Sequence, residues 1–296
     1  MDRPAARLAF PALIVANLSL AAGPWMVRLA DVGPVASGFW RLALVLPILA
    51  WLALRQSRGR PFPTWPLIGA VALGGLMFAA DLAAWHEGIL RTRLANATLF
   101  GNMSSFLFAF YGFLVLRTLP RPLQILALLL AAGGVALLLG GSYELSSANF
   151  TGDLLCLLAA FFYALYLILV DRARQAMASW PVLAIATAAG ALPLLLLSLA
   201  LGEQVVPQDW TPLILLSIGS QLVGQGLLIY ALGHLPTLVV AVALLTQPAA
   251  TAAIGWVIYG ERLTMPDFVG IILISVAMVL IRLPDRKLAT LPAEAH

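Results

Sequence analysis

The sequence predicts an all-α membrane protein in which ten transmembrane helices form two inverted five-helix repeats around a central cavity. Hydrophobic residues make up 62% of the 296 residues and charged residues only 10%, too few to cover the surface of a soluble domain. Ten apolar stretches follow one another, and nearly every Lys and Arg lies between them. Because a helix needs about 20 apolar residues to cross a bilayer core of about 30 Å, each stretch can form one span.

Proline, glycine and charged residues separate the stretches, as is typical of loops. The predicted spans are residues 8–28, 35–54, 66–86, 94–116, 122–140, 153–170, 180–200, 211–232, 238–258 and 267–283. The first stretch follows Arg3 and Arg7 and is also similar to a secretory signal, with a small-residue cleavage zone at 21–23. Its length and the even number of spans favour a retained helix.

The basic residues are distributed unevenly between the two sides of the membrane. The side of the N-terminus carries Arg3, Arg7, Arg55, Arg58, Arg60, Arg117, Arg121, Arg172, Arg174, Arg282, Arg286 and Lys287, and the other side carries Arg28, Arg91, Arg93 and Arg262. Cytoplasmic loops are enriched in Lys and Arg. We therefore expect a multi-pass protein of the plasma (inner) membrane with both termini in the cytoplasm.

Few features favour an enzyme or a nucleic-acid-binding protein. The net charge of +4 comes from residues at helix ends, so no nucleic acid is expected as a partner. The single Cys156 excludes a cysteine metal cluster, and the three histidines have no helical i, i+4 partner. No Walker loop or long hydrophilic segment is present. We expect no cofactor, no metal and no catalytic residue.

The two halves of the chain share short motifs. Residues 85–90 (WHEGIL) precede the fourth span and residues 230–235 (YALGHL) precede the ninth, with the shared pattern aromatic-x-x-Gly-x-Leu. This similarity predicts a duplication, with residues 1–144 as the first five-helix repeat and 145–296 as the second. Because five is odd, the second copy would be inverted. Inverted repeats are common in secondary transporters, whose substrate site lies where the repeats meet.

Several of these elements resemble the drug/metabolite transporter superfamily, in its EamA-type ten-helix branch. The matching elements are Phe39-Trp40-Arg41, Gly133-Gly134-Val135, Gln247-Pro248 and Gly260-Glu261-Arg262-Leu263-Thr264, followed by Phe268 and Gly270. The first half departs from the pattern, with residues 116–119 (LRTL) where a Glu is usual. The resemblance implies export of small metabolites, and the chain looks most similar to YddG-type exporters of aromatic and other neutral amino acids.

The leading hypothesis is therefore a secondary transporter that exports neutral or aromatic amino acids by alternating access. The alternatives are an exporter of drug-like cations or other metabolites, an intramembrane enzyme and a pore. The expected partners are the lipid bilayer and a small amphipathic substrate, and both a monomer and a homodimer are compatible with the sequence.

Two ionisable residues lie well inside the predicted spans. Arg41 and Asp81 lie at similar depths, about 9 and 8 Å from the outer ends of spans two and three at 1.5 Å per residue. Charges in a span are costly and usually mark a pathway or a pair. The two side chains could form a structural ion pair. Alternatively, Asp81 binds a substrate ammonium group or takes up a proton, or Arg41 extends to the outer surface.

One face of the third span combines aromatic rings with this carboxylate. Gly74, Phe78, Asp81 and Trp85 have helical i, i+4, i+7 and i+11 spacing, which suits an amphipathic amine. Ordinary packing of the two aromatic side chains is the alternative. His86 follows, and it is interpreted either as a solvated residue at a loop edge or as a proton relay.

Uncharged polar residues recur inside the other spans. Such groups either hydrogen-bond between helices or line a wet cavity. The predicted substrate-binding set is Asn17, Phe78, Asp81, Trp85, Asn96, Asn102, Tyr163, Gln221, Gln225 and Gln247. Spans five and ten are almost purely apolar, so we expect them to face lipid or to mediate dimer contacts.

Overall fold

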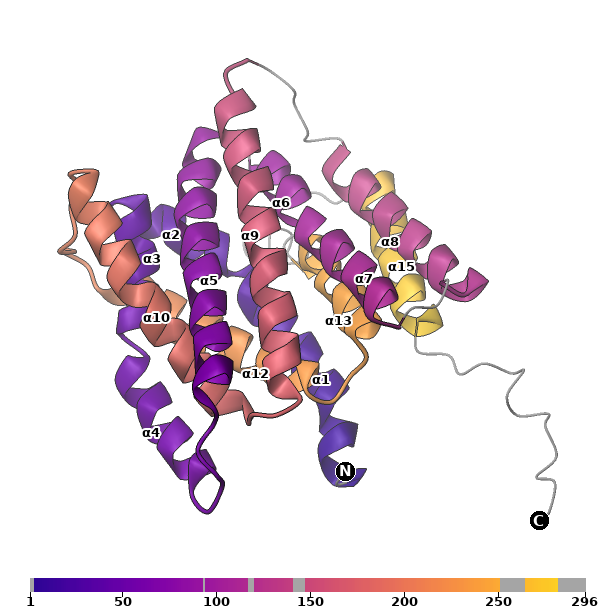
Figure 1. Ribbon diagram of the computed structural model, residues 1–296. Coiled ribbons are helices and arrows are strands. Elements are labelled where there is room, and N and C mark those ends of the chain that lie inside the picture. Colours follow the sequence, from indigo (N-terminus) through magenta and orange to yellow (C-terminus); the bar gives the residue numbers. More distant parts are fainter. Residues whose placement is uncertain (1–2, 93, 117–119, 141–146, 251–263, 282–296) are drawn as a thin grey trace, which may run out of the picture.

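A computed structural model describes residues 3–92, 94–116, 120–140, 147–250 and 264–281, and every element in them is helical (Figure 1). The elements are α1 (Arg3–Ala21), α2 (Gly23–Leu29), α3 (Pro34–Ala43), α4 (Leu46–Ser57), α5 (Trp65–Arg91), α6 (Leu94–Gly101), α7 (Met103–Leu116), α8 (Pro122–Gly140), α9 (Phe150–Arg174), α10 (Ser179–Ala200), α11 (Thr211–Leu215), the π-helical η1 (Leu216–Gln225), α12 (Gly226–Leu232), α13 (Thr237–Leu244) and α15 (Met265–Leu280).

The ten predicted spans correspond to ten apolar helical segments. Seven of them are long and apolar enough to cross a bilayer, and three are shorter apolar helices. The ends of spans nine and ten, residues 251–258 and 282–283, lie outside the described residues. The all-helical membrane architecture is thus confirmed.

Several predicted spans are interrupted helices, as prolines within or near the ends of spans predict. Pro24 and Pro47 occupy the first turns of α2 and α4. Proline lacks the N–H that a continuing helix requires but fits a first turn, where that N–H has no partner. A further interruption between α6 and α7 lies at Asn102. These breaks place helix ends inside the membrane, next to the cavity described below.

The centre of the fold is α5, which packs against α9 and α10 (Figure 1). Small residues allow the close approach of α5 and α10. A Cβ atom at Gly75 would overlap the backbone carbonyl of Ala186, and one at Gly190 would lie 2.8 Å from the Gly75 oxygen. These contacts hold α5, and with it Phe78 and Asp81, in a fixed position.

Enlarging Gly75 is therefore expected to destabilise the protein. Gly75→Leu should lower the melting temperature in detergent by several degrees or prevent accumulation of folded protein, because overpacking typically costs about 1–3 kcal/mol. Gly69→Leu on the same helix is the matched control, since a Cβ there meets nothing within 4 Å. Equal melting temperatures for the two variants would contradict this packing.

A loop carboxylate fixes the start of α3. Glu203 accepts hydrogen bonds from the backbone N–H groups of Val35 (3.2 Å) and Ala36 (2.8 Å). A negative charge at a helix N-terminus is favourable because of the helix dipole. The indole N–H of Trp40 donates to the carbonyl of Val205 at 2.6 Å. The α10–α11 loop thereby orients the helix that carries Arg41.

The apolar helices α8 and α15 pack against each other at one side of the molecule (Figure 1). A Cβ atom at Gly134 would lie 2.7 Å from the Gly270 oxygen, so the two backbones are close. Their outer faces expose large apolar side chains, including Leu129, Ile272 and Val279. This position matches the expectation for spans five and ten.

Candidate functional site

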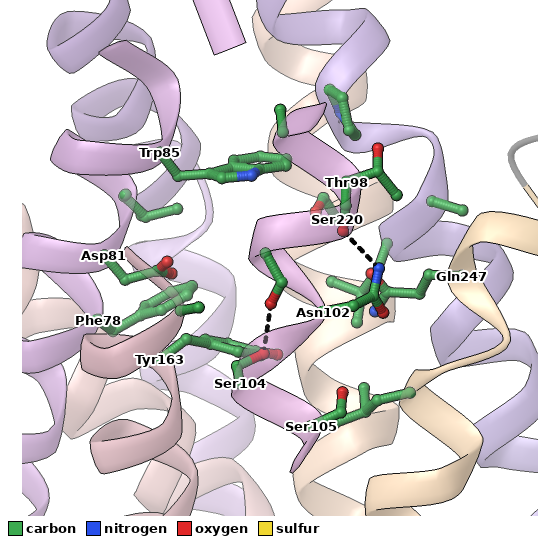
Figure 2. Close-up of a pocket in the computed structure, with 18 of the residues that line it drawn as sticks. Phe78, Asp81, Trp85, Thr98, Asn102, Ser104, Ser105, Tyr163, Ser220 and Gln247 are labelled. Carbon is green, nitrogen blue, oxygen red and sulfur yellow. Dashed lines mark hydrogen bonds between the residues drawn. The ribbon is translucent and has the colours of Figure 1, made fainter. Parts of the chain in front are cut away.

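The main cavity lies between α1–α7 on one side and α9–α13 on the other. It contains about 790 Å³ of empty space, including its mouth. Figure 2 shows Asp81 and Trp85 on one wall, opposite Asn102 and Gln247. Its lining consists of Leu20, Ala21, Pro24, Arg41, Phe78, Asp81, Leu82, Trp85, Ala97, Thr98, Gly101, Asn102, Ser104, Ser105, Ala160, Tyr163, Ser220, Gln225, Leu244 and Gln247.

An aromatic cluster with one amide forms part of the cavity wall. The ring of Phe78 stacks on Tyr166 at a centroid distance of 4.6 Å and lies 6.1 Å from Tyr163. Gln225 joins the two phenols, because its Nε2 donates to the Tyr163 oxygen (3.2 Å) and its Oε1 accepts from Tyr166 (3.3 Å). The ring of Phe78 and the amide of Gln225 are therefore held in place from several directions.

Arg41 is a buried cation that forms no salt bridge with a carboxylate of the described residues. Its side chain is 4% exposed, and its Nε has no hydrogen-bond partner. The guanidinium carbon lies 5.5 Å from the centroid of the Phe78 ring. The backbone carbonyl of Arg41 accepts a hydrogen bond from Ser217 at 2.9 Å. Arg41 thus lines the main cavity from a helix that is itself anchored.

Asp81 lies farther from the end of its helix than predicted. Because α5 continues to Arg91, Asp81 lies ten residues from the end of its helix, which is about 15 Å at 1.5 Å per residue. Asp81 is therefore in the central part of α5. Asp81 forms no hydrogen bond or salt bridge with the described residues. The burial of Asp81, 9% exposed, is therefore not offset by a local donor.

The expected direct ion pair between Arg41 and Asp81 is not formed. The described residues contain one salt bridge, between Arg91 and Glu87 at the end of α5. Arg41 and Asp81 both line the cavity and interact electrostatically without touching. Two separate charges of opposite sign in one cavity offer binding sites for a ligand that carries both charges.

A polar stripe on α6 and α7 forms the opposite wall. Thr98, Asn102 and Ser105 all line the cavity, and the Asn102 amide donates to the Thr98 carbonyl at 2.6 Å. Asn102 was predicted from the sequence as a site residue, whereas Thr98 and Ser220 were not. The i, i+4, i+7 spacing of the three residues on this stripe is a signal that could have identified Thr98.

His86 is buried between α3 and α5, which corrects its interpretation as a solvated loop-edge residue. It is 0% exposed, and its Nδ1 lies 2.8 Å from the Ser37 hydroxyl and 3.0 Å from the Pro34 carbonyl. The predicted span ended at residue 86, whereas α5 extends to Arg91. His86 is absent from the cavity lining, although Trp85 belongs to it.

Three other predicted site residues make contacts outside the main cavity. Asn96 donates to Asp153 at 3.0 Å, where the same carboxylate accepts from Thr92 at 2.6 Å. Gln221 donates to Thr187 on α10 at 3.0 Å. Asn17 donates to the Ala243 carbonyl and to Thr246, at 2.6 and 3.2 Å. The structure brings the remaining seven predicted substrate-binding residues together around the cavity.

Three helices converge beyond one end of the cavity. The hydroxyl of Tyr111 on α7 accepts a hydrogen bond from Arg172 on α9 at 3.0 Å. Thr237 at the start of α13 donates to Asp171 at 3.4 Å, and a Cβ at Gly112 would lie 3.4 Å from the Thr237 Cβ. These five residues are here called the closing cluster. On their helices they lie six to nine residues from the cavity residues Ser105, Tyr163 and Leu244, which is about 9–14 Å at 1.5 Å per residue.

Comparison with known proteins establishes the family. The model of the EamA-like transporter family matches the chain twice, over residues 8–140 and 150–283. The chain belongs to the EamA-like transporter family. The main cavity of this EamA-like chain is lined from both matched segments. In Figure 1, α1 and α9, with which these segments begin, run in opposite directions.

Individual relatives agree with this assignment. A protein named "Uncharacterized transporter" from Archaeoglobus fulgidus is 27% identical over 252 residues, which cover 82% of this chain and 84% of that protein. A protein of known crystal structure is 17% identical and aligns with a TM-score of 0.75, covering 95% of this chain and 98% of that chain. This EamA-like protein is thus a multi-pass membrane transporter with the fold of its family.

Proposed function

We propose that this transporter exports neutral amino acids with apolar or aromatic side chains. The observation that carries the proposal is that Arg41 and Asp81 line one cavity without pairing with each other. A zwitterion has a carboxylate for Arg41 and an ammonium group for Asp81. Because a buried unpaired charge is costly, a ligand that neutralises both is favoured over an empty cavity.

The rest of the cavity suits the side chain of such a substrate. Phe78, Trp85 and Tyr163 provide an aromatic wall. The side-chain amides of Asn102 and Gln247 lie across the cavity from it (Figure 2). Binding sites of this kind combine apolar surface with a few placed polar groups.

The proposed mechanism is alternating access between two inverted repeats, residues 1–144 and 145–296. The opposite directions of α1 and α9 support the inversion. The distribution of basic residues supports a location in the plasma (inner) membrane with both termini in the cytoplasm. In that orientation the closing cluster lies on the cytoplasmic side, and Asp81 is the residue in position to couple transport to a proton.

Counterflow into proteoliposomes tests the proposal. Liposomes that contain purified protein and unlabelled phenylalanine or leucine should accumulate the labelled amino acid with saturable kinetics, whereas glutamate and lysine should compete poorly. Transport equal to that of protein-free liposomes for every neutral amino acid would contradict it. Selective transport of a lipophilic cation would instead support the alternative cargo, which needs Asp81 but not Arg41.

A further inference from the structure

A second cavity lies beside the segment that follows α13. It contains about 1180 Å³ of empty space, including its mouth, and is formed by α1, residues 246–250 and α15. Its walls are mainly apolar, with Phe10, Ile14 and Met278 among them. The neighbouring side chains of Leu18 and Val279 are 51% and 62% exposed. This cavity, here called the side groove, therefore faces the hydrocarbon of the bilayer.

Among the described residues that line the side groove, one buried acceptor has no hydrogen-bond partner. Asn17 is 1% exposed, and its Nδ2 donates to the Ala243 carbonyl and to Thr246. Its Oδ1 makes no hydrogen bond. An unsatisfied buried polar atom typically costs about 1–3 kcal/mol. A ligand that donates a hydrogen bond to Asn17 Oδ1 would remove this cost.

The depth of Asn17 restricts the chemistry of that ligand. Asn17 lies nine residues into a span of 22 residues that begins at Leu8, about 14 Å at 1.5 Å per residue. The headgroups of phospholipids lie outside the hydrocarbon core of about 30 Å and do not reach this depth. The donor must therefore belong to a small molecule that dissolves in the core.

We propose that the side groove binds a neutral lipophilic molecule with a single hydrogen-bond donor, such as a long-chain alcohol, which enters sideways from the bilayer. The hydroxyl donates to Asn17 Oδ1, and the alkyl chain lies along Phe10 and Ile14. Asn17 also donates a hydrogen bond to Thr246. The next residue, Gln247, lines the main cavity. Binding does not depend on the proposed amino-acid transport and can be measured without it.

Photolabelling of the full-length protein in nanodiscs tests this site. A dodecanol analogue with a diazirine near the hydroxyl should label α1 and α15, as mapped by mass spectrometry. Dodecanol should compete at least tenfold better than dodecane, which has no donor. Equal competition by the two, or labelling spread evenly over the lipid-facing helices, would overturn the proposal.

Two variants and one control sharpen the test. Asn17→Leu should reduce labelling at least fivefold, and labelling like that of the wild type in a folded variant would contradict the role of the amide. If Asn17→Leu does not fold, Ser275→Phe decides, because Ser275 is exposed and lines the groove. Ser275→Phe should block labelling, whereas Ile272→Phe on the same helix, outside the groove lining, should not. Equal labelling of these two phenylalanine variants would overturn the proposal.

Discussion

Asp81→Asn is expected to reduce counterflow of a neutral amino acid at least tenfold and to leave the amount of folded protein unchanged. The amide has the shape of the carboxylate but lacks the charge that binds an ammonium group. A hydrogen bond to a charged group is worth about 1.5–3 kcal/mol, and 1.4 kcal/mol corresponds to a factor of ten in affinity. The measurement is the substrate concentration dependence of counterflow in proteoliposomes.

Arg41 provides the matched comparison for this prediction. Arg41→Lys keeps the positive charge but loses the planar, bidentate group that fits a carboxylate, so it should transport more weakly than the wild type and better than Arg41→Gln. Unchanged transport by Asp81→Asn would contradict the binding role of the carboxylate. Loss of folded protein in both Asp81→Asn and Arg41→Gln would indicate that the two charges act in stability instead.

Crosslinking of the closing cluster is expected to stop transport completely. A Cβ at Gly112 would lie 3.4 Å from the Thr237 Cβ, close to the 3.5–4.5 Å separation found in disulfides. In a Cys156→Ala background, the pair Gly112→Cys and Thr237→Cys should therefore form a disulfide on oxidation. A fixed cluster cannot open that end of the cavity, so counterflow should fall to the background level.

Reduction with dithiothreitol should restore transport, and each single cysteine variant should be insensitive to oxidation. The single Thr237→Cys variant also loses the hydroxyl that donates to Asp171, so it controls for that bond. Full transport by a quantitatively crosslinked protein would show that this end of the molecule does not open during the cycle.

Hydropathy predicted the ten membrane segments because burial in lipid acts on the average composition of about 20 residues. The ends of helices were less predictable. α5 continues for five residues beyond the predicted end at residue 86, with Glu87 and Arg91 forming an ion pair one turn apart. These two charged residues predicted a loop after residue 86. A helix that projects from the membrane can also contain charged residues, because its end is in water. This extension places Asp81 ten residues from the end of its helix and changes the environment of His86.

The candidate site was predictable only in part. The sequence shows which polar residues fall inside spans, but composition does not determine which neighbouring helix or cavity each side chain faces. Asn96 faces Asp153, a residue that the predicted span placed at its very end. Gln221 faces α10 from a π-helical segment, whose wider winding was not expected from an α-helical period. These directions depend on contacts between helices that are distant in the sequence.

Accessibility of a single cysteine in the cavity tests the central claim most directly. Ser105→Cys in the Cys156→Ala background is a small change at a residue that lines the cavity and is 2% exposed. A membrane-impermeant maleimide should label it from both sides of oriented vesicles, and a transported amino acid should slow the labelling. An absence of labelling from either side, with the protein folded, would mean a dry and permanently closed centre and would contradict the account.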